Sequence, residues 1–258
     1  MENGNAPIIP AAAAGCKELH GKKLNGRLRF VQRLLQRLPG RCRLCGAGVR
    51  GARLCSGCWA DLPWLPAAHC PICALPVEAG QICGACLRHP PPWERTRAAL
   101  LYDFPVDGLV GALKYRGDLS LAPLLADCLA PTLDKTAVDA LLPLPLHPSR
   151  LAARGFNQAV EIARPLARAL GLPLWLDAAQ RSRDTPPQAG LSRDARRKNL
   201  RGAFAVRAAM VAGRRIAVLD DVMTSGATLG ELALTLKRAG ALEIECWVIA
   251  RALPPGQS

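Results

Sequence analysis

The cysteine spacing in residues 42–86 constrains this chain more than any other feature. Two Cys-x2-Cys pairs separated by nine residues occur once, and the same arrangement recurs 28 residues later. Each unit is too short to bury a hydrophobic core, so a bound metal must hold it. Four thiolates from two such pairs can surround one Zn²⁺ tetrahedrally. The predicted ligands are Cys42, Cys45, Cys55, Cys58, Cys70, Cys73, Cys83 and Cys86.

Zinc is favoured over disulfides or a redox pair, because four pairs in two matched sets are unusual for a redox motif. The repeat favours one ion in each unit, 42–58 and 70–86, although an arrangement in which alternate pairs share one metal stays open. All eight positions are cysteine, which leaves no open coordination position, so the zinc, one ion or two, is predicted to be structural. Cys16, Cys128 and Cys246 fall outside the pattern and are predicted to be ordinary thiols.

The cysteines and the first residues together predict a cytoplasmic protein. Structural disulfides are rare in the cytosol, whereas metal-binding thiols are common there. The N-terminal segment has no basic residue before its apolar patch, and Pro7 and Pro10 interrupt that patch, which argues against a secretory signal. The chain has no run of about 18 apolar, uncharged residues, so we predict no membrane span.

Positive charge is concentrated near the N-terminus. The chain carries a net charge of +14, and residues 1–60 contribute 11 basic residues against 2 acidic ones. Such an excess points to an anionic partner: a phosphate ligand, nucleic acid or an acidic protein. Residues 22–38 alternate apolar and basic side chains at helical spacing and predict an amphipathic helix after a disordered leader. This helix either packs on the protein with a solvated basic face or contacts nucleic acid, an acidic partner or a membrane surface.

From about residue 96 the sequence alternates between predicted strands and helices. The predicted strands are 98–104, 138–144, 216–219 and 244–250, and the predicted helices are 106–115, 119–133, 157–170 and 229–239. Continuous apolar strands alternating with helices indicate an α/β domain around a mainly parallel sheet. Three prolines at 90–92 make a stiff boundary before it. We therefore expect a leader with a basic helix over 1–40, a cysteine module over 41–90 and the α/β domain over 96–254.

Residues 216–229 form the most specific stretch for a ligand. Four apolar residues lead into Asp220 and Asp221, and a turn of small residues around Gly226 precedes a helix. Bare N–H groups at a helix N-terminus suit a phosphate monoester, and two carboxylates suit a vicinal diol of a sugar. An acid-capped strand followed by an ordinary helix is the alternative. Residues 15–23 lack the spacing and the Ser or Thr of a Walker loop, which excludes an ATPase interpretation.

Residues 219–228 resemble the phosphoribosyl pyrophosphate (PRPP) loop of type I phosphoribosyltransferases. Over residues 42–252 the whole chain resembles the ComF/GntX family of competence-associated proteins. The cysteine units and the segments 113–118, 143–158 and 185–204 carry this resemblance, in the expected order. It implies a type I phosphoribosyltransferase-like parallel-sheet domain preceded by a double zinc-ribbon module.

The resemblance also implies roles for individual residues. Asp220 and Asp221 would be the catalytic residues, and they would hold the ribose 2′- and 3′-hydroxyl groups of PRPP. Lys114 and Arg154 are candidate pyrophosphate contacts, and residues 181–201, which are rich in arginine, would form a mobile loop over the site. A solvated surface is the alternative for Lys114 and for the arginines of that loop. The predicted PRPP-binding residues are Asp220, Asp221, Val222, Met223, Thr224, Ser225, Gly226, Ala227 and Thr228.

The resemblance implies substitution at C1 of PRPP with release of pyrophosphate, and Mg²⁺ would neutralise the leaving group. Two further functions stay open: a sensor that binds PRPP or a nucleotide without turnover, and an adaptor in competence, DNA uptake or DNA use. The adaptor would bind single-stranded DNA or a DNA-uptake protein through the basic N-terminal region. No residue identifies the acceptor, although 96–118 are expected to recognise it. A glutamine-dependent amidotransferase is disfavoured, because residue 2 is Glu and no glutaminase domain is evident.

Overall fold

The computed structural model describes residues 39–134, 137–183 and 201–254. The predicted leader, the basic helix at 22–38 and most of the predicted loop at 181–201 therefore lie outside the described residues. Two compact units make up the chain, Met1–Pro63 and Trp64–Ser258. The division falls between the two cysteine units, so the second of them belongs to the same compact unit as the α/β domain.

The first cysteine unit is small and has little secondary structure. Strand β1 (Pro39–Arg41) pairs antiparallel with β2 (Gly48–Arg50), and helix α2 (Ser56–Ala60) follows. Cys55 caps α2, because its sulfur accepts the backbone N–H of Cys58. Few described side chains of this unit are buried, so packing alone gives it little stability.

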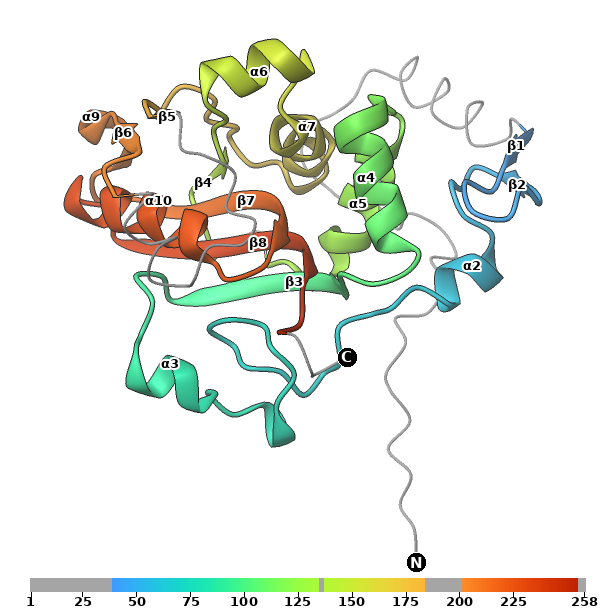
Figure 1. Cartoon of the computed structure of the whole chain (residues 1–258), viewed down its shortest axis with the longest axis horizontal. Helices are drawn as coiled ribbons and strands as arrows, with labels where there is room; N and C mark the ends of the chain where they lie inside the picture. The colour runs from blue at the N-terminus through green and yellow to red at the C-terminus, as the bar shows by residue number, and fades with distance from the viewer. Residues whose placement is uncertain (1–38, 135–136, 184–200, 255–258) are drawn as a thin grey trace, which may run out of the picture. The chain divides into compact units, whose positions relative to one another are not determined.

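The larger unit opens with the second cysteine unit and continues into a parallel sheet (Figure 1). The second cysteine unit contains the 3-10 turn η1 (Glu78–Gly80) and helix α3 (Gly84–Arg88). The four sheet strands are β3 (Arg95–Leu101), β4 (Ala140–Pro143), β7 (Arg215–Met223) and β8 (Glu243–Arg251). They lie in the order β3-β8-β7-β4, and every neighbouring pair is parallel. This confirms the predicted parallel-sheet α/β fold.

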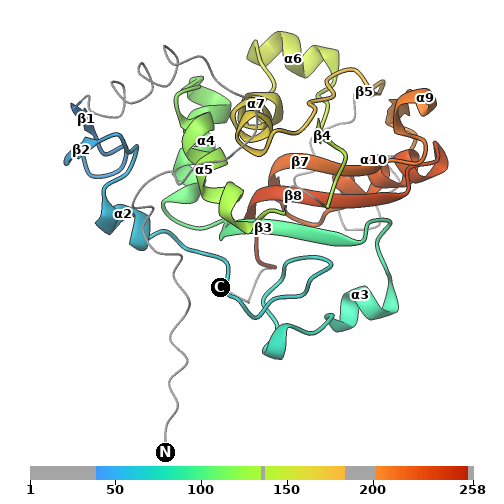
Figure 2. The same ribbon diagram turned by 180° about the vertical axis from the view of Figure 1, so that it is seen from behind.

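Helices cover both faces of the sheet (Figures 1 and 2). Helices α5 (Leu121–Leu129) and α7 (Gln158–Leu170) pack together on one face, and α10 (Ala227–Arg238) packs on the other. The core under α10 includes Ala74 and Trp93, which come from the cysteine unit and the segment after it. The second cysteine unit therefore shares a hydrophobic core with the sheet.

The remaining elements surround this sheet. Helix α4 (Val106–Arg116) precedes α5, the turn η2 (Ala130–Thr132) follows α5, and α6 (Pro148–Arg154) precedes α7. Strands β5 (Ala179–Arg181) and β6 (Phe204–Val206) pair antiparallel, and α9 (Ala208–Val211) follows them. None of the described helices is long and apolar enough to cross a membrane.

The predicted end of one strand was wrong, and one helix was not predicted. The strand predicted at 216–219 continues to Met223, because Asp220 and Val222 keep their pairing with β8. The acid pair is thus held within the strand rather than after it. Helix α6 was not predicted, because its short length gives no clear apolar period.

Candidate functional site

The carboxyl end of β7 brings the predicted acid pair and the phosphate loop together. Strand β7 carries Asp220 and Asp221 as consecutive residues near its carboxyl end. The loop Thr224–Gly226 then leads into α10. Within the described part of the chain, the backbone N–H groups of these three loop residues donate to no protein acceptor. The loop therefore presents three free donors beside two carboxyl groups, at the N-terminus of a helix twelve residues long.

Gly226 gives this loop its shape. It has φ of 73°, in the left-handed region that favours glycine, and it forms the N-cap of α10. A Cβ added there would lie 3.1 Å from the Cη2 atom of Trp93. Backbone conformation and lack of space thus both require glycine at this position.

Lys114 of α4 contacts the acid pair directly. Its Nζ lies 2.5 Å from Oδ2 of Asp221, and both side chains are largely buried. Burial opposes the charged form of Lys114, but the attraction of Asp221 and Asp220 outweighs it and raises the pKa of the amine. Burial and the neighbouring Asp221 charge raise the pKa of Asp220 well above its ordinary value. The two carboxyl groups and the lysine therefore behave as one electrostatic unit.

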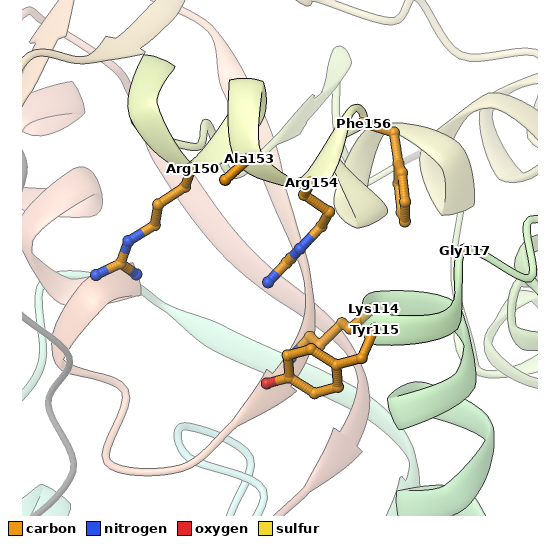
Figure 3. A pocket seen from close by; sticks show the side chains of 7 residues that line it. All are labelled: Lys114, Tyr115, Gly117, Arg150, Ala153, Arg154 and Phe156. Carbon is orange, nitrogen blue, oxygen red and sulfur yellow. The ribbon is translucent and has the colours of Figure 1, made fainter.

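A basic pocket opens beside Lys114, between α4 and α6 (Figure 3). Its volume is about 340 Å³, and it is lined by Lys114, Tyr115, Gly117, Arg150, Ala153, Arg154 and Phe156. The guanidinium of Arg154 lies 5.7 Å from the centre of the Tyr115 ring, and the Tyr115 side chain is exposed. The structure thus places Lys114 and Arg154, the two predicted pyrophosphate contacts, in one cavity with no acidic lining residue.

Each cysteine unit brings its four predicted ligands together. Within each set all four sulfur atoms lie within 4.8 Å of one another. Tetrahedral coordination with Zn–S distances near 2.3 Å requires sulfur atoms about 3.8 Å apart. The Sγ–Sγ distance is 3.7 Å between Cys45 and Cys55 and 3.6 Å between Cys73 and Cys83. Both sets therefore fit one structural zinc ion each, which favours pairing within a unit over the interleaved arrangement.

One thiol in each unit has a pKa below its ordinary value. Burial opposes ionisation of Cys42, but backbone N–H groups of Cys45 and Cys55 outweigh it and lower the pKa of the thiol to about 6. Cys70 occupies the equivalent position, and backbone donors likewise lower its pKa to about 7. Thiolates are the form that binds zinc, so each unit already stabilises one ligand in that form. Cys128 and Cys246, outside both units, are buried thiols.

Two residues next to the loop, Arg251 and Trp93, were not predicted from the sequence. Arg251, at the end of β8, donates to the carbonyl groups of Met223 and Thr224. Trp93 lies against Gly226. The signal for Arg251 was present, since a charged residue that ends a continuous apolar strand reaches the same edge of a parallel sheet as Asp220. Trp93 gave no comparable signal, because only the tertiary structure brings it to the loop.

Comparison with known proteins adds two family models. The double zinc ribbon domain matches residues 34–87, and the phosphoribosyl transferase domain matches residues 157–254. The first match covers the cysteine units and the second covers the phosphate loop, so the matches follow the order of these features along the chain. The first model spans both cysteine units, including the one that shares a core with the sheet.

Curated relatives match along most of the chain. The DNA utilization protein YhgH of Shigella flexneri is 33% identical over 226 residues, covering 84% of this chain and 99% of that protein. Competence protein F of Haemophilus influenzae is 34% identical over 224 residues, covering 82% and 97% respectively. Competence protein ComFC of Streptococcus pneumoniae is 25% identical over 240 residues, covering 90% and 98%. Similarity of this extent, together with both domain matches, shows that the chain belongs to the ComF/GntX family of competence and DNA-utilization proteins.

Proposed function

We propose that the end of β7 and the loop Thr224–Gly226 bind PRPP. One observation carries the proposal: two adjacent carboxyl groups lie directly before three unpaired backbone N–H groups at a helix N-terminus. The N–H groups and the helix dipole suit the doubly charged 5′-phosphate. Asp220 and Asp221 accept hydrogen bonds from the ribose 2′- and 3′-hydroxyl groups. The remaining residues of the proposed site, Val222, Met223, Ala227 and Thr228, shape the backbone around these contacts.

The pyrophosphate of PRPP points into the basic pocket in this proposal. Lys114 joins the two parts of the site, because it contacts Asp221 and also lines the pocket. Arg150 and Arg154 supply two further positive charges there. Mg²⁺, when bound with PRPP, neutralises part of the pyrophosphate charge. Lys114 and Arg154 orient the leaving group, and the carboxyl pair orients the sugar.

The reaction we propose is substitution at C1. The bond from C1 to the pyrophosphate oxygen breaks, a bond from C1 to a nitrogen nucleophile forms, and the acceptor loses one proton. Positive charge develops on the ribose during this step, and the adjacent carboxylate charge favours it. The protein mainly positions the sugar and separates the charges. Exposed Tyr115, at the mouth of the pocket, offers an aromatic face to a planar acceptor.

Isothermal titration with magnesium PRPP tests the binding step. We expect the wild type to bind and Asp221→Asn to bind about 10-fold to 100-fold more weakly, because hydrogen bonds to charged groups contribute about 1.5–3 kcal/mol. Thr224→Ala keeps the backbone donors and should lose less. Melting curves of both variants separate a local effect from unfolding. The proposal would be contradicted if the folded wild type gave no binding signal.

A pyrophosphate-release assay across a panel of nitrogenous bases tests turnover. Release with one base, abolished by Asp221→Asn, supports a transferase. The alternative is a PRPP sensor or an adaptor for DNA uptake or DNA use, and the names of the relatives, DNA utilization protein and competence protein, favour the adaptor. PRPP binding without release for any acceptor supports this second function.

We also propose that the protein acts in the cytoplasm and that residues 1–40 contact single-stranded DNA or a DNA-uptake protein. The excess of basic residues in 1–60 supports this proposal. Binding to an oligonucleotide should weaken steeply with added salt. Deletion of residues 1–40 should abolish it, and unchanged binding would contradict the proposal. The division into a leader over 1–40, a cysteine module over 41–90 and a transferase-like domain over 96–254 is part of the same proposal.

A further inference from the structure

The second cysteine unit is bound tightly to the domain that carries the phosphate loop. Three consecutive carbonyl groups, those of Pro71, Ile72 and Cys73, belong to its first Cys-x2-Cys turn, and all three accept hydrogen bonds from the domain. The donors are Thr96 N to Pro71 at 3.0 Å, Trp93 Nε1 to Ile72 at 2.7 Å and Arg251 Nε to Cys73 at 2.7 Å. This turn is therefore held by sulfur ligation on one side and by the domain on the other.

Arg251 connects this turn to the phosphate loop. Its side chain is buried, with 5% of the residue exposed, and its Nη1 donates to the carbonyl groups of Met223 and Thr224. A trans peptide unit is planar, and its C=O and N–H groups point in opposite directions. Binding of these two carbonyl groups by Arg251 therefore turns the N–H groups of Thr224 and Ser225 away from it.

Trp93 makes a second connection. Its indole N–H donates to the Ile72 carbonyl, and its ring edge lies 3.1 Å from the position that a Cβ of Gly226 would take. The residue is 8% exposed and belongs to the core under α10. Thr96 reinforces the same contact, because its hydroxyl also donates to Ile72. Two buried side chains thus run from a single cysteine turn to opposite ends of the phosphate loop, at Met223 and at Gly226.

On its other side the turn faces the sulfur atoms. The backbone N–H of Cys83 lies 3.4 Å from Sγ of Cys70, and Sγ of Cys73 lies 3.6 Å from Sγ of Cys83. A metal ion held by these sulfurs fixes the backbone between Cys70 and Cys73, which bears the three carbonyl groups. We expect loss of the metal to free the acceptors for Trp93 and Arg251 from these positions.

We propose that metal binding by Cys70, Cys73, Cys83 and Cys86 and phosphate binding by the loop Thr224–Gly226 are thermodynamically coupled through Trp93 and Arg251. The proposal rests on the proposed function, since it assigns a phosphate ester to that loop. Trp93 and Arg251 are positioning residues in this scheme, because they act on the loop and do not touch the ligand. Coupling between two sites is reciprocal, so PRPP must raise the affinity for the metal by the same factor as the metal raises the affinity for PRPP.

The reciprocal effect gives the first test. The Cys45→Ser chain loses a ligand of the first unit and leaves the second unit as the intact four-cysteine site. Zinc transfer from this chain to a zinc-selective chelator is followed with and without saturating magnesium PRPP. We expect PRPP to slow the transfer or to lower its equilibrium extent by about 5-fold or more, the lower end of typical coupling. An unchanged transfer in a sample shown by titration to hold PRPP would overturn the proposal.

Two conservative variants give the second test. Arg251→Lys keeps the positive charge but cannot bind the Cys73 and Met223 carbonyl groups together. Trp93→Phe keeps a ring beside Gly226 but loses the N–H that binds Ile72. Both should retain zinc, bind PRPP at least 5-fold more weakly and lose the effect of PRPP on zinc transfer. Arg207→Lys, at an exposed pair with Asp177, is the matched control and should behave as wild type.

Hydrogen–deuterium exchange of peptides over 222–230 separates this proposal from the proposed function. Removal of zinc from the second unit should speed exchange of the loop amides, whether or not PRPP is the ligand. Faster exchange combined with no PRPP binding by the wild type would sustain the coupling and refute the proposed ligand. Equal exchange with and without zinc, in a chain that stays folded, would overturn the coupling even if PRPP binds.

Discussion

The two cysteine units share one spacing but differ in their surroundings. In the first unit only Cys42 is buried, Cys45 is exposed, and Cys55 and Cys58 are half-buried. In the second unit Cys70 and Cys86 are buried, and the carbonyl of Cys73 bonds to Arg251 of the sheet. The shared spacing determines what each unit binds. The different surroundings determine what each unit contacts: the carbonyl of Cys42 bonds within the first unit, whereas the first Cys-x2-Cys turn of the second unit bonds to Trp93, Thr96 and Arg251.

The largest expected difference is in stability. Cys70→Ser removes a fully buried ligand from the core-linked unit, whereas Cys42→Ser removes the equivalent ligand from the first unit. We expect Cys70→Ser to lower the main melting transition by roughly 10 °C, since a loss of several kcal/mol corresponds to about 2–4 °C per kcal/mol in a domain of this size.

Cys42→Ser should leave the main transition in place, and each variant should lose about one zinc ion per chain. Calorimetry with metal analysis measures both quantities. Equal effects of the two substitutions on the main transition would remove the distinction between the units.

A smaller effect is expected where the second unit meets the loop. Gly226→Ala places a Cβ 3.1 Å from Trp93 and at a φ of 73°. The left-handed conformation costs a non-glycine residue about 1–2 kcal/mol, so PRPP should bind about 5-fold to 30-fold more weakly. The matched control is Gly230→Ala, whose Cβ would lie 3.4 Å from the same ring within α10.

Gly230→Ala has no conformational strain and should bind PRPP within about twofold of wild type, with a slightly more stable helix. Titration calorimetry compares the two variants. If both lose affinity equally, the loop conformation is not what Gly226 provides.

The smallest expected effect is a small change in stability that leaves the affinity for PRPP unchanged. Asp139 binds Arg215, with Oδ1 3.0 Å from Nη2, near the start of β7 and therefore far along the strand from the loop. The side-chain and backbone N–H groups of Arg215 lower the pKa of Asp139. The pair therefore stabilises the fold above the ordinary aspartate pKa, and this stabilisation disappears as pH falls through the lowered value.

Asp139→Asn should lower the melting temperature slightly at neutral pH and not at strongly acidic pH, because partly exposed pairs contribute little. Its affinity for PRPP should match wild type. Reduced affinity in this variant would mean that any loss of stability weakens the site, and the specific role of the second unit would fail.

The sequence predicted the parallel-sheet fold and the two four-cysteine groups well, because both depend on local patterns. Apolar runs located all four parallel strands, and Cys-x2-Cys pairs located the metal ligands. The acid pair and Gly226 were recognisable, since a strand, small residues and a helix follow one another along the chain. Strand ends were less accurate, because the pairing of Asp220 and Val222 with β8 depends on a partner strand.

Contacts between distant segments could not be predicted from local patterns. Arg251 lies 178 residues from Cys73, and Trp93 lies 21 residues from Ile72. The ion pair of Lys114 with Asp221 likewise depends on how α4 packs beside β7. The role of Lys114 came from a family resemblance, whereas its partner emerged only from the three-dimensional arrangement.

The most direct test of the account is a crystal structure of the full chain with magnesium PRPP. We predict the 5′-phosphate against the N–H groups of Thr224, Ser225 and Gly226, and the ribose diol on Asp220 and Asp221. The pyrophosphate should lie toward Lys114 and Arg154. Bound PRPP elsewhere on the protein, with the loop donors making no contact to phosphate, would contradict the account.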